Sequence, residues 1–404
     1  MNLKFPSINE QMDLIRRGVS EIIPEEELVK KLERSLSTGK PIVVKLGCDP
    51  SRPDLHIGHA VILRKMRQFQ DLGHHAILII GDFTGMIGDP SGKSKTRPPL
   101  TLEETRINGK SYTEQATKIL DSSKLEIIHN SDWLGKMSFE DVIKLSAKFT
   151  VSQMMERDDF HKRFNAEQPI SLHEFLYPLA QAQDSVAIKS DIELGGTDQK
   201  FNLLVGRELQ RANGQEPQCI LTMPILEGTD GVEKMSKSLN NYIGITEEPF
   251  DMYGKTLSIP DASIYNWFVL CSNYPTAKLD ELKSMISSDP RNAKRLLARE
   301  IVKVYYNEET SVKAEEKFDT LFIKKDVPDD IAEMDLVYEN GVFSLTQLLV
   351  DCGFVPSKGE AKRLIQGGGV TVNGEKISDA NFQLTEGGEK IIKAGKRNFV
   401  KIRR

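Results

Sequence analysis

The stretch PIVVKLGCDPSRPDLHIGHAVILRKMRQFQDLGHHAILIIG, residues 41–81, decides the fold class of this chain. Its two ends, residues 41–47 and 75–81, are short apolar runs typical of buried strands. Between them, residues 58–72 carry apolar side chains close to helical spacing, and Gly73 follows as a C-terminal stop. Strand, helix and strand in succession predict the βαβ unit of a parallel α/β sheet, whose ligands bind in the loops after the strands.

The pattern changes along the rest of the chain. Residues 101–211 are mainly helical in pattern, residues 223–245 return to short apolar pieces and loops, and the chain beyond Pro249 reads as helical. Asp289-Pro290 has the form of a helix start, with a capping residue before a proline. We therefore expect a parallel-sheet α/β domain with a helical insertion, an α-helical domain, a linker and a small α+β domain. The expected boundaries are residues 1–245, 246–325, 326–341 and 342–404.

The expected tail domain has clear local signals. Ser344 is placed to open one helix, and Ser357 with Glu360 has the spacing of a capping box for a second. The outward face of the second helix would carry Lys358, Lys362 and Arg363. A short apolar run then meets Asn373-Gly374, a strong hairpin-turn signal. These signals predict two helices followed by an antiparallel hairpin.

Composition narrows the class of protein. The chain has 404 residues, no apolar run of membrane-spanning length, and an N-terminus without the apolar core of a signal peptide. Its four cysteines are scattered without a C-x-x-C pair, which argues against a zinc site or a disulfide framework. We therefore expect a cytoplasmic enzyme that has no contact with a membrane and no metal site of its own.

Charge is distributed unevenly along the chain. Residues 342–404 hold eleven Lys/Arg and six Asp/Glu, a net +5, whereas the remainder holds 43 basic and 53 acidic residues, a net −10. A basic tail on an acidic body indicates a polyanionic partner. A chance imbalance in a short window fits the charge count equally well.

Two separated motifs suggest phosphate chemistry. The first is H-I-G-H, His56 to His59, at the expected start of a helix, where backbone N–H groups favour phosphate and Gly58 allows a close approach. The second is K-M-S-K-S, residues 234–238, whose two lysines suit a loop that closes over a polyphosphate and neutralises departing pyrophosphate. Taken singly, each motif also fits a solvated surface feature.

Together, and in this order, the two motifs resemble the paired signatures of the class I aminoacyl-tRNA synthetases. Three further segments resemble the bacterial tyrosyl-tRNA synthetases, in particular the type with an intact K-M-S-K-S loop. These segments are G-D-P-S-G-K (residues 88–93) followed by Arg97, Y-P-L-A-Q-A-Q-D (residues 177–184), and G-G-T-D-Q (residues 195–199). The tail resembles a small RNA-binding domain first known from a ribosomal small-subunit protein. The likeness covers nearly the whole chain.

The resemblance implies a fold and an activity. It implies a Rossmann-like catalytic domain, an α-helical domain on the anticodon side, and an RNA-binding tail of the ribosomal-protein S-four type. The activity would be that of a tyrosine–tRNA ligase, which activates L-tyrosine with ATP, releases pyrophosphate and transfers tyrosine to the 3′ end of tRNA(Tyr). The implied co-reactants are ATP and the Mg²⁺ that accompanies it, and the implied assembly is a homodimer.

The resemblance also assigns residues. Asp184 would bind the phenol, and the α-ammonium would be bound by Asp89, Tyr177 and Gln181. Gln199 would touch the amino-acid carboxylate. Tyr177, Gln181 and Asp184 recur at i, i+4 and i+7, which is one face of a helix. That spacing is also ordinary core spacing, although three polar side chains on a core face are costly without partners.

The remaining implied roles concern ATP and tRNA. His56, His59, Lys234 and Lys237 would serve the transition state. Asp198 would accept a hydrogen bond from the ATP ribose, and tRNA phosphates would meet the exposed cations of the tail. The full implied ATP set is Asp49, Ser51, His56, Gly58, His59, Lys93, Arg97, Asp198, Lys234 and Lys237. The implied RNA set is Lys358, Lys362, Arg363 and Arg397.

One position departs from the family pattern. Many bacterial members carry a tyrosine that helps to bind the substrate hydroxyl, and this chain has Lys45 there. Two alternative functions therefore stay open at the level of sequence. One is a tryptophan–tRNA ligase, which shares the architecture, and the other is a catalytically inactive RNA-binding relative.

Overall fold

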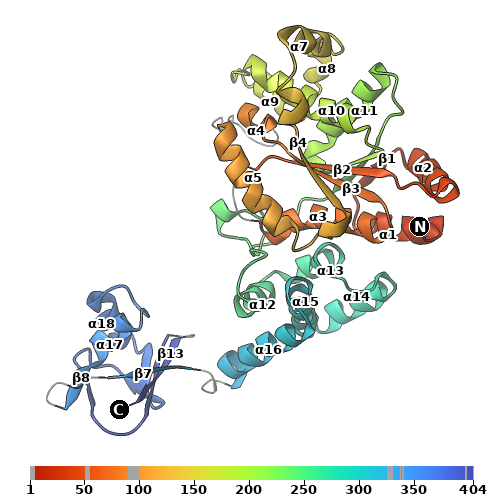
Figure 1. Cartoon of the computed structure of the whole chain (residues 1–404). Coiled ribbons are helices and arrows are strands. Elements are labelled where there is room, and N and C mark those ends of the chain that lie inside the picture. The colour runs from red at the N-terminus through yellow and green to blue at the C-terminus, as the bar shows by residue number, and fades with distance from the viewer. Residues whose placement is uncertain are drawn as a thin grey trace. The chain divides into compact units, whose positions relative to one another are not determined.

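Figure 1 shows a computed structural model of the chain, which describes residues 5–50, 55–89, 101–324, 331–336, 338, 341–395 and 398–403. The chain forms two compact units, Met1–Ser311 and Val312–Arg404. Within the described ranges, every helix is too short or too polar to span a lipid bilayer.

The first unit is built on a six-stranded sheet with the strand order β1-β6-β5-β2-β3-β4. All neighbouring strands pair in parallel except β1, which is antiparallel to β6. The parallel pairing of β2 with β3, with helix α3 between them in sequence, confirms the expected βαβ unit. The strands are β1 (Glu21–Ile23), β2 (Val43–Cys48), β3 (His75–Ile80), β4 (Leu125–His129), β5 (Ile192–Gly196) and β6 (Cys219–Met223).

Helices cover both faces of this sheet, with α3 on one side and α10 and α11 on the other (Figure 1). A parallel sheet covered on both faces needs nearly continuous apolar strands. The central strand β3 meets this need, since residues 76–80 are all buried. The helices are α1 (Ile8–Arg16), α2 (Glu25–Thr38), α3 (Ile57–Asp71), α4 (Thr84–Ile87), α5 (Leu102–Ala116), α6 (Ser131–Leu134), α7 (Phe139–Ser146), α8 (Val151–Met154), α9 (Asp158–Asn165), α10 (Leu176–Ile188) and α11 (Lys200–Ala212).

The segment expected to be mainly helical, residues 101–211, also contributes β4 and β5 to the sheet. Each of these strands is only five residues long and lies between helices, so the helical pattern around them dominates the sequence. The two strands matter for the site, because the residues that follow β4 and β5 lie at the carboxyl edge of the sheet, where ligands bind.

The helical region that follows β6 begins with α12. The Asp289 side chain accepts a hydrogen bond from Asn292 N (3.1 Å) with Pro290 in the first turn of α15, which confirms the expected helix start. Ala293, Leu297 and Ile301 form its buried face. The helices are α12 (Pro249–Leu257), α13 (Ile264–Cys271), α14 (Leu279–Ser288), α15 (Pro290–Tyr305) and α16 (Glu308–Phe318), the last spanning the boundary between the units.

The second unit contains a five-stranded sheet, β10-β9-β12-β13-β7, and a two-stranded sheet, β11-β8. The predicted hairpin is present: Asn373 and Gly374 have φ of 50° and 85°, the left-handed backbone that the tight turn between β9 and β10 requires. The elements are β7 (Ala332–Asp335), β8 (Val342–Ser344), α17 (Leu345–Asp351), α18 (Lys358–Gln366), β9 (Val370–Val372), β10 (Glu375–Ile377), β11 (Gln383–Thr385), β12 (Lys390–Ala394) and β13 (Asn398–Arg403).

Strand β7 lies inside the stretch expected to be a linker. It pairs in parallel with β13, so these four residues belong to the sheet of the second unit. The charged composition of this stretch, rich in Asp and Lys, is typical of a linker, but within β7 the charge of Glu333 forms ion pairs with Lys401 (3.8 Å) and Arg403 on the neighbouring strand. A charged edge of this kind also discourages pairing with foreign strands.

Candidate active site

The two signature motifs lie side by side in the first unit. Backbone hydrogen bonds join Ile57 N to Ile243 O (2.9 Å) and Ile245 N to Leu55 O (3.2 Å). The backbone N–H of Gly58 also donates to the sulfur of Met235 (3.3 Å). The start of α3 and the loop that carries the two lysines are therefore adjacent, although almost 180 residues separate them in sequence.

His56 lies at this junction as the N-terminal cap of α3. Its ring stacks on that of His59 with the centroids 3.7 Å apart, and His59 Nδ1 accepts a hydrogen bond from the His56 backbone (3.4 Å). Burial, helped by the nearby charges of His59 and Lys237, lowers the pKa of His56 to about 3. The imidazole is therefore neutral at physiological pH. Its buried Nδ1 has no hydrogen-bond partner among the described residues.

The K-M-S-K-S loop is fixed at its base by hydrogen bonds, and its two lysines differ in exposure. Asn241 is buried and donates to Asp230 (2.7 Å), while its Oδ1 accepts from the backbone of Ser236 (2.8 Å). Lys237 Nζ lies 5.6 Å from the centre of the Tyr242 ring, and Lys234 is exposed. The backbone of the loop is thus fixed locally, with Lys234 exposed and Lys237 half-buried beside Tyr242.

A second group of polar residues lies along α10. Tyr177, Gln181 and Asp184 share one face of this helix, as predicted, and Tyr177 and Asp184 are buried. Asp184 accepts hydrogen bonds from Trp133 Nε1 (2.9 Å) and Asn130 Nδ2 (3.3 Å). Neither donor could be found from the sequence, since no motif marks the segment after β4.

Burial raises the pKa of Asp184 to about 7. The positive charge of Lys45 and the hydrogen bonds from Trp133 and Asn130 act in the opposite direction. The result is a buried carboxyl group that changes its charge near neutral pH. Such perturbed groups are concentrated at functional sites.

A chain of side-chain hydrogen bonds joins the remaining predicted tyrosine ligands. Asn202 Nδ2 donates to both Gln181 Oε1 and Gln199 Oε1 (3.0 Å each), and Gln199 Nε2 donates to Asp89 Oδ2 (2.9 Å). Arg157 then approaches Asp89 (3.4 Å) and Asn202 (3.3 Å). Asn202 and Arg157 were not predicted, because their role depends on side chains brought together from separate elements.

Asp49 is placed differently from its expected role at ATP. One of its carboxylate oxygens accepts from the Tyr177 hydroxyl (2.8 Å) and the other from Thr84 (2.7 Å). A side chain at Gly81 would come within 2.0 Å of the same carboxylate, so a glycine is required there. In this structure the Asp49 side chain belongs to the group around α10, and an ATP contact would need a change of partners.

Asp198 follows β5, and the charges of Asp89 and Lys234, one from each group, both act on its carboxyl. Burial and the negative charge of Asp89 raise its pKa, whereas the positive charge of Lys234 acts in the opposite direction. This position suits a residue at the boundary between an amino-acid pocket and a nucleotide site. Ser51, Lys93, Arg97 and Arg397 lie outside the described residues.

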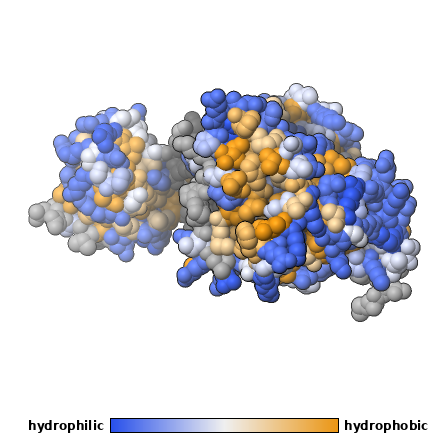
Figure 2. Space-filling model, turned by 90° about the horizontal axis from the view of Figure 1, so that it is seen from above, coloured by the Kyte–Doolittle hydropathy of each residue, from blue (hydrophilic) through white to orange (hydrophobic). Residues whose placement is uncertain are grey.

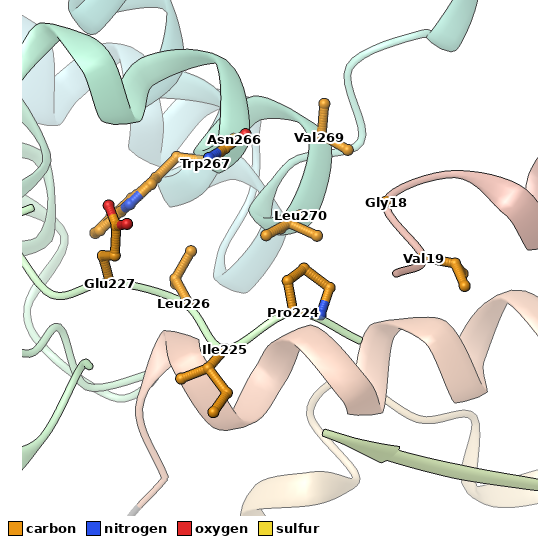
Figure 3. Close-up of a pocket in the computed structure, with 10 residues that line it drawn as sticks. All are labelled: Gly18, Val19, Pro224, Ile225, Leu226, Glu227, Asn266, Trp267, Val269 and Leu270. Carbon is orange, nitrogen blue, oxygen red and sulfur yellow. The ribbon is translucent and has the colours of Figure 1, made fainter. Parts of the chain in front are cut away.

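A further pocket of about 230 Å³ has Leu226 and Glu227 in its lining, and these two residues pair through the backbone with Met235 and Lys234 of the K-M-S-K-S loop. Figure 3 shows its lining, which comes from the turn before β1, the segment after β6 and α13. The indole nitrogen of Trp267, a lining residue, is buried without a hydrogen-bond partner among the described residues. None of the predicted site residues lines this pocket.

In the second unit, α18 presents the predicted basic face. Lys358, Lys362 and Arg363 are exposed, while Ala361 and Ile365 are buried against the core of the unit. The Ser357 hydroxyl accepts a hydrogen bond from Glu360 N (3.3 Å) and so caps the helix. A short basic helix face on a compact α+β unit is a suitable surface for a polyanion.

Residues 37–323 match the model of the class I tRNA synthetases (W and Y), and residues 345–391 match the S4 domain. The tyrosine–tRNA ligase of Salinibacter ruber is 55% identical, over 99% of this chain and 98% of that protein. The tyrosine–tRNA ligase of Chlorobaculum tepidum is 56% identical over the same shares.

Solved structures show the same fold at low sequence identity. The tyrosyl-tRNA synthetase of Archaeoglobus fulgidus complexed with L-tyrosine has a TM-score of 0.61 at 22% identity, covering 76% of this chain and 99% of that chain. A C-terminally truncated mitochondrial tyrosyl-tRNA synthetase of Aspergillus nidulans has a TM-score of 0.63 at 20% identity, covering 78% and 94%. With the family match and the long, highly identical relatives, the chain belongs to the class I tRNA synthetases of the tryptophan and tyrosine group and, within them, to the tyrosine–tRNA ligases.

Proposed function

We propose that the two groups of residues form two halves of one active site, an amino-acid half around α10 and a nucleotide half between α3 and the K-M-S-K-S loop. The reaction is the activation of L-tyrosine by ATP, followed by transfer to tRNA(Tyr). The observation that supports this most directly is the buried carboxyl of Asp184, which accepts hydrogen bonds from Trp133 and Asn130 and shares a face of α10 with Tyr177 and Gln181.

In the first step, a carboxylate oxygen of tyrosine attacks the α-phosphorus of ATP. The bond from the α-phosphorus to the oxygen that bridges it to the β-phosphate breaks, and pyrophosphate leaves with that electron pair. In the second step, a hydroxyl of the 3′-terminal ribose attacks the tyrosyl carbonyl, and AMP leaves. Neither step needs a nucleophile from the protein, so catalysis consists of positioning and charge stabilisation.

In the amino-acid half, the ionised Asp184 would accept the phenolic O–H of the substrate. The α-ammonium would be bound by Asp89, Tyr177 and Gln181, and the carboxylate would be met by Gln199. Asp89, Gln181 and Gln199 are already oriented by hydrogen bonds between Gln199 and Asp89 and from Asn202 to the two glutamines. Orientation before binding lowers the entropic cost of association.

In the nucleotide half, His59 and the neutral His56 at the start of α3 would donate to the phosphates, and Gly58 would allow the nucleotide to approach the helix. Lys234 and Lys237 would neutralise the charge that develops on pyrophosphate. Asp198 would accept a hydrogen bond from the ribose, and Ser51, Lys93 and Arg97 stay predictions for the same nucleotide. The assignment of Asp49 to ATP stays a prediction that conflicts with its present partners.

Mg²⁺ would enter with ATP as part of the substrate and add positive charge on the phosphates. Among the described residues there is no cluster of three His, Cys, Asp or Glu side chains that could hold a metal ion. Phosphate oxygens and water would therefore be the main ligands of the ion, which is the usual way in which proteins handle Mg²⁺.

The test is ATP–pyrophosphate exchange across a panel of amino acids. Exchange that depends on tyrosine, with tryptophan inert, would support the proposal. Exchange with tryptophan instead would favour the tryptophan alternative. Tight RNA binding without exchange for any amino acid would favour an inactive relative.

The second unit would bind tRNA(Tyr). Its exposed cations on α18, together with Arg397, would contact phosphates and so position the RNA more than read its sequence. The helical stretch from Pro249 to about Lys324 would lie on the anticodon side. The expected domain boundaries at residues 245, 325 and 341 belong to this proposal.

The enzyme would work as a homodimer in the cytoplasm. Large apolar side chains are exposed around α7 and α8, with Phe139 at 80%, Val151 at 71% and Leu172 at 84%. Figure 2 views the molecule from the side where these helices lie in Figure 1 and shows apolar residues gathered there. Contiguous exposed apolar surface marks interaction sites, and a second copy is the partner we propose. The four cysteines are free thiols, which suits a reducing compartment.

Sedimentation equilibrium tests the dimer. The wild-type chain should sediment as a dimer, and Val151→Glu or Leu172→Glu should shift it to a monomer. Leu36→Glu, at an exposed apolar residue on α2, is the matched control and should stay dimeric. A monomeric wild-type protein at micromolar concentration would contradict the proposal.

A further inference from the structure

Lys45 replaces the tyrosine that many bacterial relatives place at the substrate hydroxyl, and its ammonium group is fully buried. The three N–H groups of Lys45 all have acceptors. These are Glu193 Oε1 (2.8 Å), the backbone carbonyl of Gln181 (3.0 Å) and the Ser185 hydroxyl (2.7 Å). An ammonium group has three donors, so none is left for a substrate hydroxyl.

The ion pair between Lys45 and Glu193 is built into the sheet. The two residues are register partners on the neighbouring strands β2 and β5, and both side chains are completely buried. The Glu193 carboxylate also accepts from Gln181 Nε2 (3.1 Å), Ser185 (3.1 Å) and Gln218 (2.5 Å). A buried pair is tolerated only when its remaining hydrogen-bonding capacity is satisfied in this way.

The hydrogen bonds continue from this pair to the proposed ligands of the substrate's amino-acid group. Glu193 holds the side-chain nitrogen of Gln181, and the oxygen of the same amide accepts from Asn202. Asn202 also donates to Gln199, and Gln199 donates to Asp89. Asp184, at the opposite end of the substrate, takes its hydrogen bonds from Trp133 and Asn130, and the positive charge of Lys45 lowers its pKa.

We propose that Lys45 is a positioning residue which, through Glu193, orients Gln181 and the ligands of the substrate's amino group, and that it makes no contact with the phenol. The inference deepens the proposed function of the pocket and rests on it. In this chain, the residue at the position that contacts the phenol in many relatives is Lys45, and it instead helps to hold the ligands of the substrate's amino group. Discrimination between tyrosine and phenylalanine is then the task of Asp184.

Removing the ammonium group alone should be more harmful than removing the whole pair. The Lys45→Met chain would keep a buried carboxylate without its counter-charge, and Glu193 would then draw other donors away from their places. The double variant Lys45→Met/Glu193→Gln removes both charges and keeps a hydrogen-bonding group beside Gln181. The double variant should therefore recover part of what the single variant loses.

The experiment is tyrosine-dependent and phenylalanine-dependent ATP–pyrophosphate exchange by the wild-type chain and both variants. For Lys45→Met, KM for tyrosine should rise roughly tenfold or more, with KM for ATP unchanged. Because the positive charge of Lys45 lowers the pKa of Asp184, the exchange is measured well above pH 7, where Asp184 is ionised. Under that condition the ratio of kcat/KM for tyrosine to that for phenylalanine should be retained, and the double variant should lower KM for tyrosine again. If Lys45→Met does not fold, the same kinetic constants are compared between the double variant and the wild-type chain.

Lys31→Met is the matched control. Lys31 is a second buried lysine, 2% exposed and paired with Asp191 (3.1 Å) just before β5, and it has no bond to the chain that leads to Gln181. Its loss should lower Tm without changing KM for tyrosine. The same pattern in Lys45→Met would overturn the inference, because Lys45 would then be only structural.

Two other outcomes would also overturn it. A collapse of the tyrosine-to-phenylalanine ratio in Lys45→Met would show that Lys45 acts on the phenol. A wild-type chain without tyrosine-dependent exchange would refute the proposed function, and this inference with it, before any variant is compared.

Discussion

The two halves of the site are built differently. In the amino-acid half, nearly every polar side chain is tied to another one, from Asp184 with Trp133 and Asn130 to the chain that joins Gln181 to Asp89. In the nucleotide half, the buried Nδ1 of His56 has no partner among the described residues, and Lys234 is exposed.

This difference matches two different tasks. Recognition of a small amino acid benefits from ligands that are fixed before binding. Stabilisation of charge on departing pyrophosphate needs cations that are available at the transition state, and such groups need no partner in the free protein. The comparison therefore predicts that changes in the two halves will alter different kinetic parameters.

The largest effect is expected in the nucleotide half. Lys237→Ala should lower the rate of ATP–pyrophosphate exchange by about 100- to 1000-fold, because it removes a charge used mainly in the transition state. Lys255→Ala is the matched control: Lys255 also lies over the Tyr242 ring (5.1 Å) and forms an ion pair with Glu247 (2.7 Å). An unchanged rate in Lys237→Ala would remove this lysine from the mechanism.

A smaller effect is expected in the amino-acid half. Asp184→Asn should lower the preference for tyrosine over phenylalanine by about 10- to 100-fold, because a neutral amide replaces a charged acceptor. The measurement is kcat/KM for each amino acid in the exchange reaction. Asp132→Asn, at a residue of α6 that does not bond to Asp184 through its side chain, provides the control. A retained preference would mean that another group recognises the phenol.

The two halves should also differ in their response to pH. Since the pKa of Asp184 is about 7 and the phenol needs an ionised acceptor, KM for tyrosine should rise as the pH falls below 7, by up to about tenfold per unit. His56 has a pKa of about 3 and is neutral between pH 6 and 8, so its titration should not change KM for ATP in this range. If KM for tyrosine and KM for ATP showed the same pH dependence, the proposed difference between the two halves of the site would be contradicted.

The same raised pKa has a consequence for folding. The pKa of Asp184 in the folded chain exceeds its ordinary value of 3.8, because burial disfavours the ionised carboxylate more than the protonated carboxyl. The contribution of this group to the free energy of unfolding is therefore fully present below pH 3.8 and is lost as the pH rises through 7.

The smallest effect is expected from substitutions in the second unit, which should not change the activation reaction in either half of the active site. Replacing Lys358, Lys362 and Arg363 together by alanine should raise KM for tRNA by roughly three- to tenfold and reduce its salt dependence, because phosphate contacts are lost. Pyrophosphate exchange should stay at the wild-type rate. Lys30→Ala, at an exposed lysine of α2, is the control for a general loss of positive charge.

The sequence alone predicts the parallel βαβ unit of the sheet and the polar face of α10 in the candidate site. The apolar runs of β2 and β3 and the helical spacing between them give the βαβ unit, and the i, i+4, i+7 spacing places Tyr177, Gln181 and Asp184 on one face of α10. Local pattern is sufficient for these features, because each depends on residues that are close in sequence.

The partners that hold the site could not be predicted in this way. The pairing of Lys45 with Glu193 depends on the register of β2 with β5, which are almost 150 residues apart. The donors Trp133 and Asn202 belong to no recognisable motif. Strand β7 could not be predicted, because its charged residues are typical of a linker. Their basic partners lie on β13, which is distant in sequence.

The most direct test of the two-half account is single-turnover formation of tyrosyl-adenylate, measured over a range of tyrosine concentrations. For Lys237→Ala, the rate constant at saturating tyrosine should fall while the Kd for tyrosine is unchanged. For Asp184→Asn, the Kd for tyrosine should rise by a larger factor than the rate constant falls. If both variants changed the same parameter to a similar extent, the division of the site into a binding half and a transition-state half would be wrong.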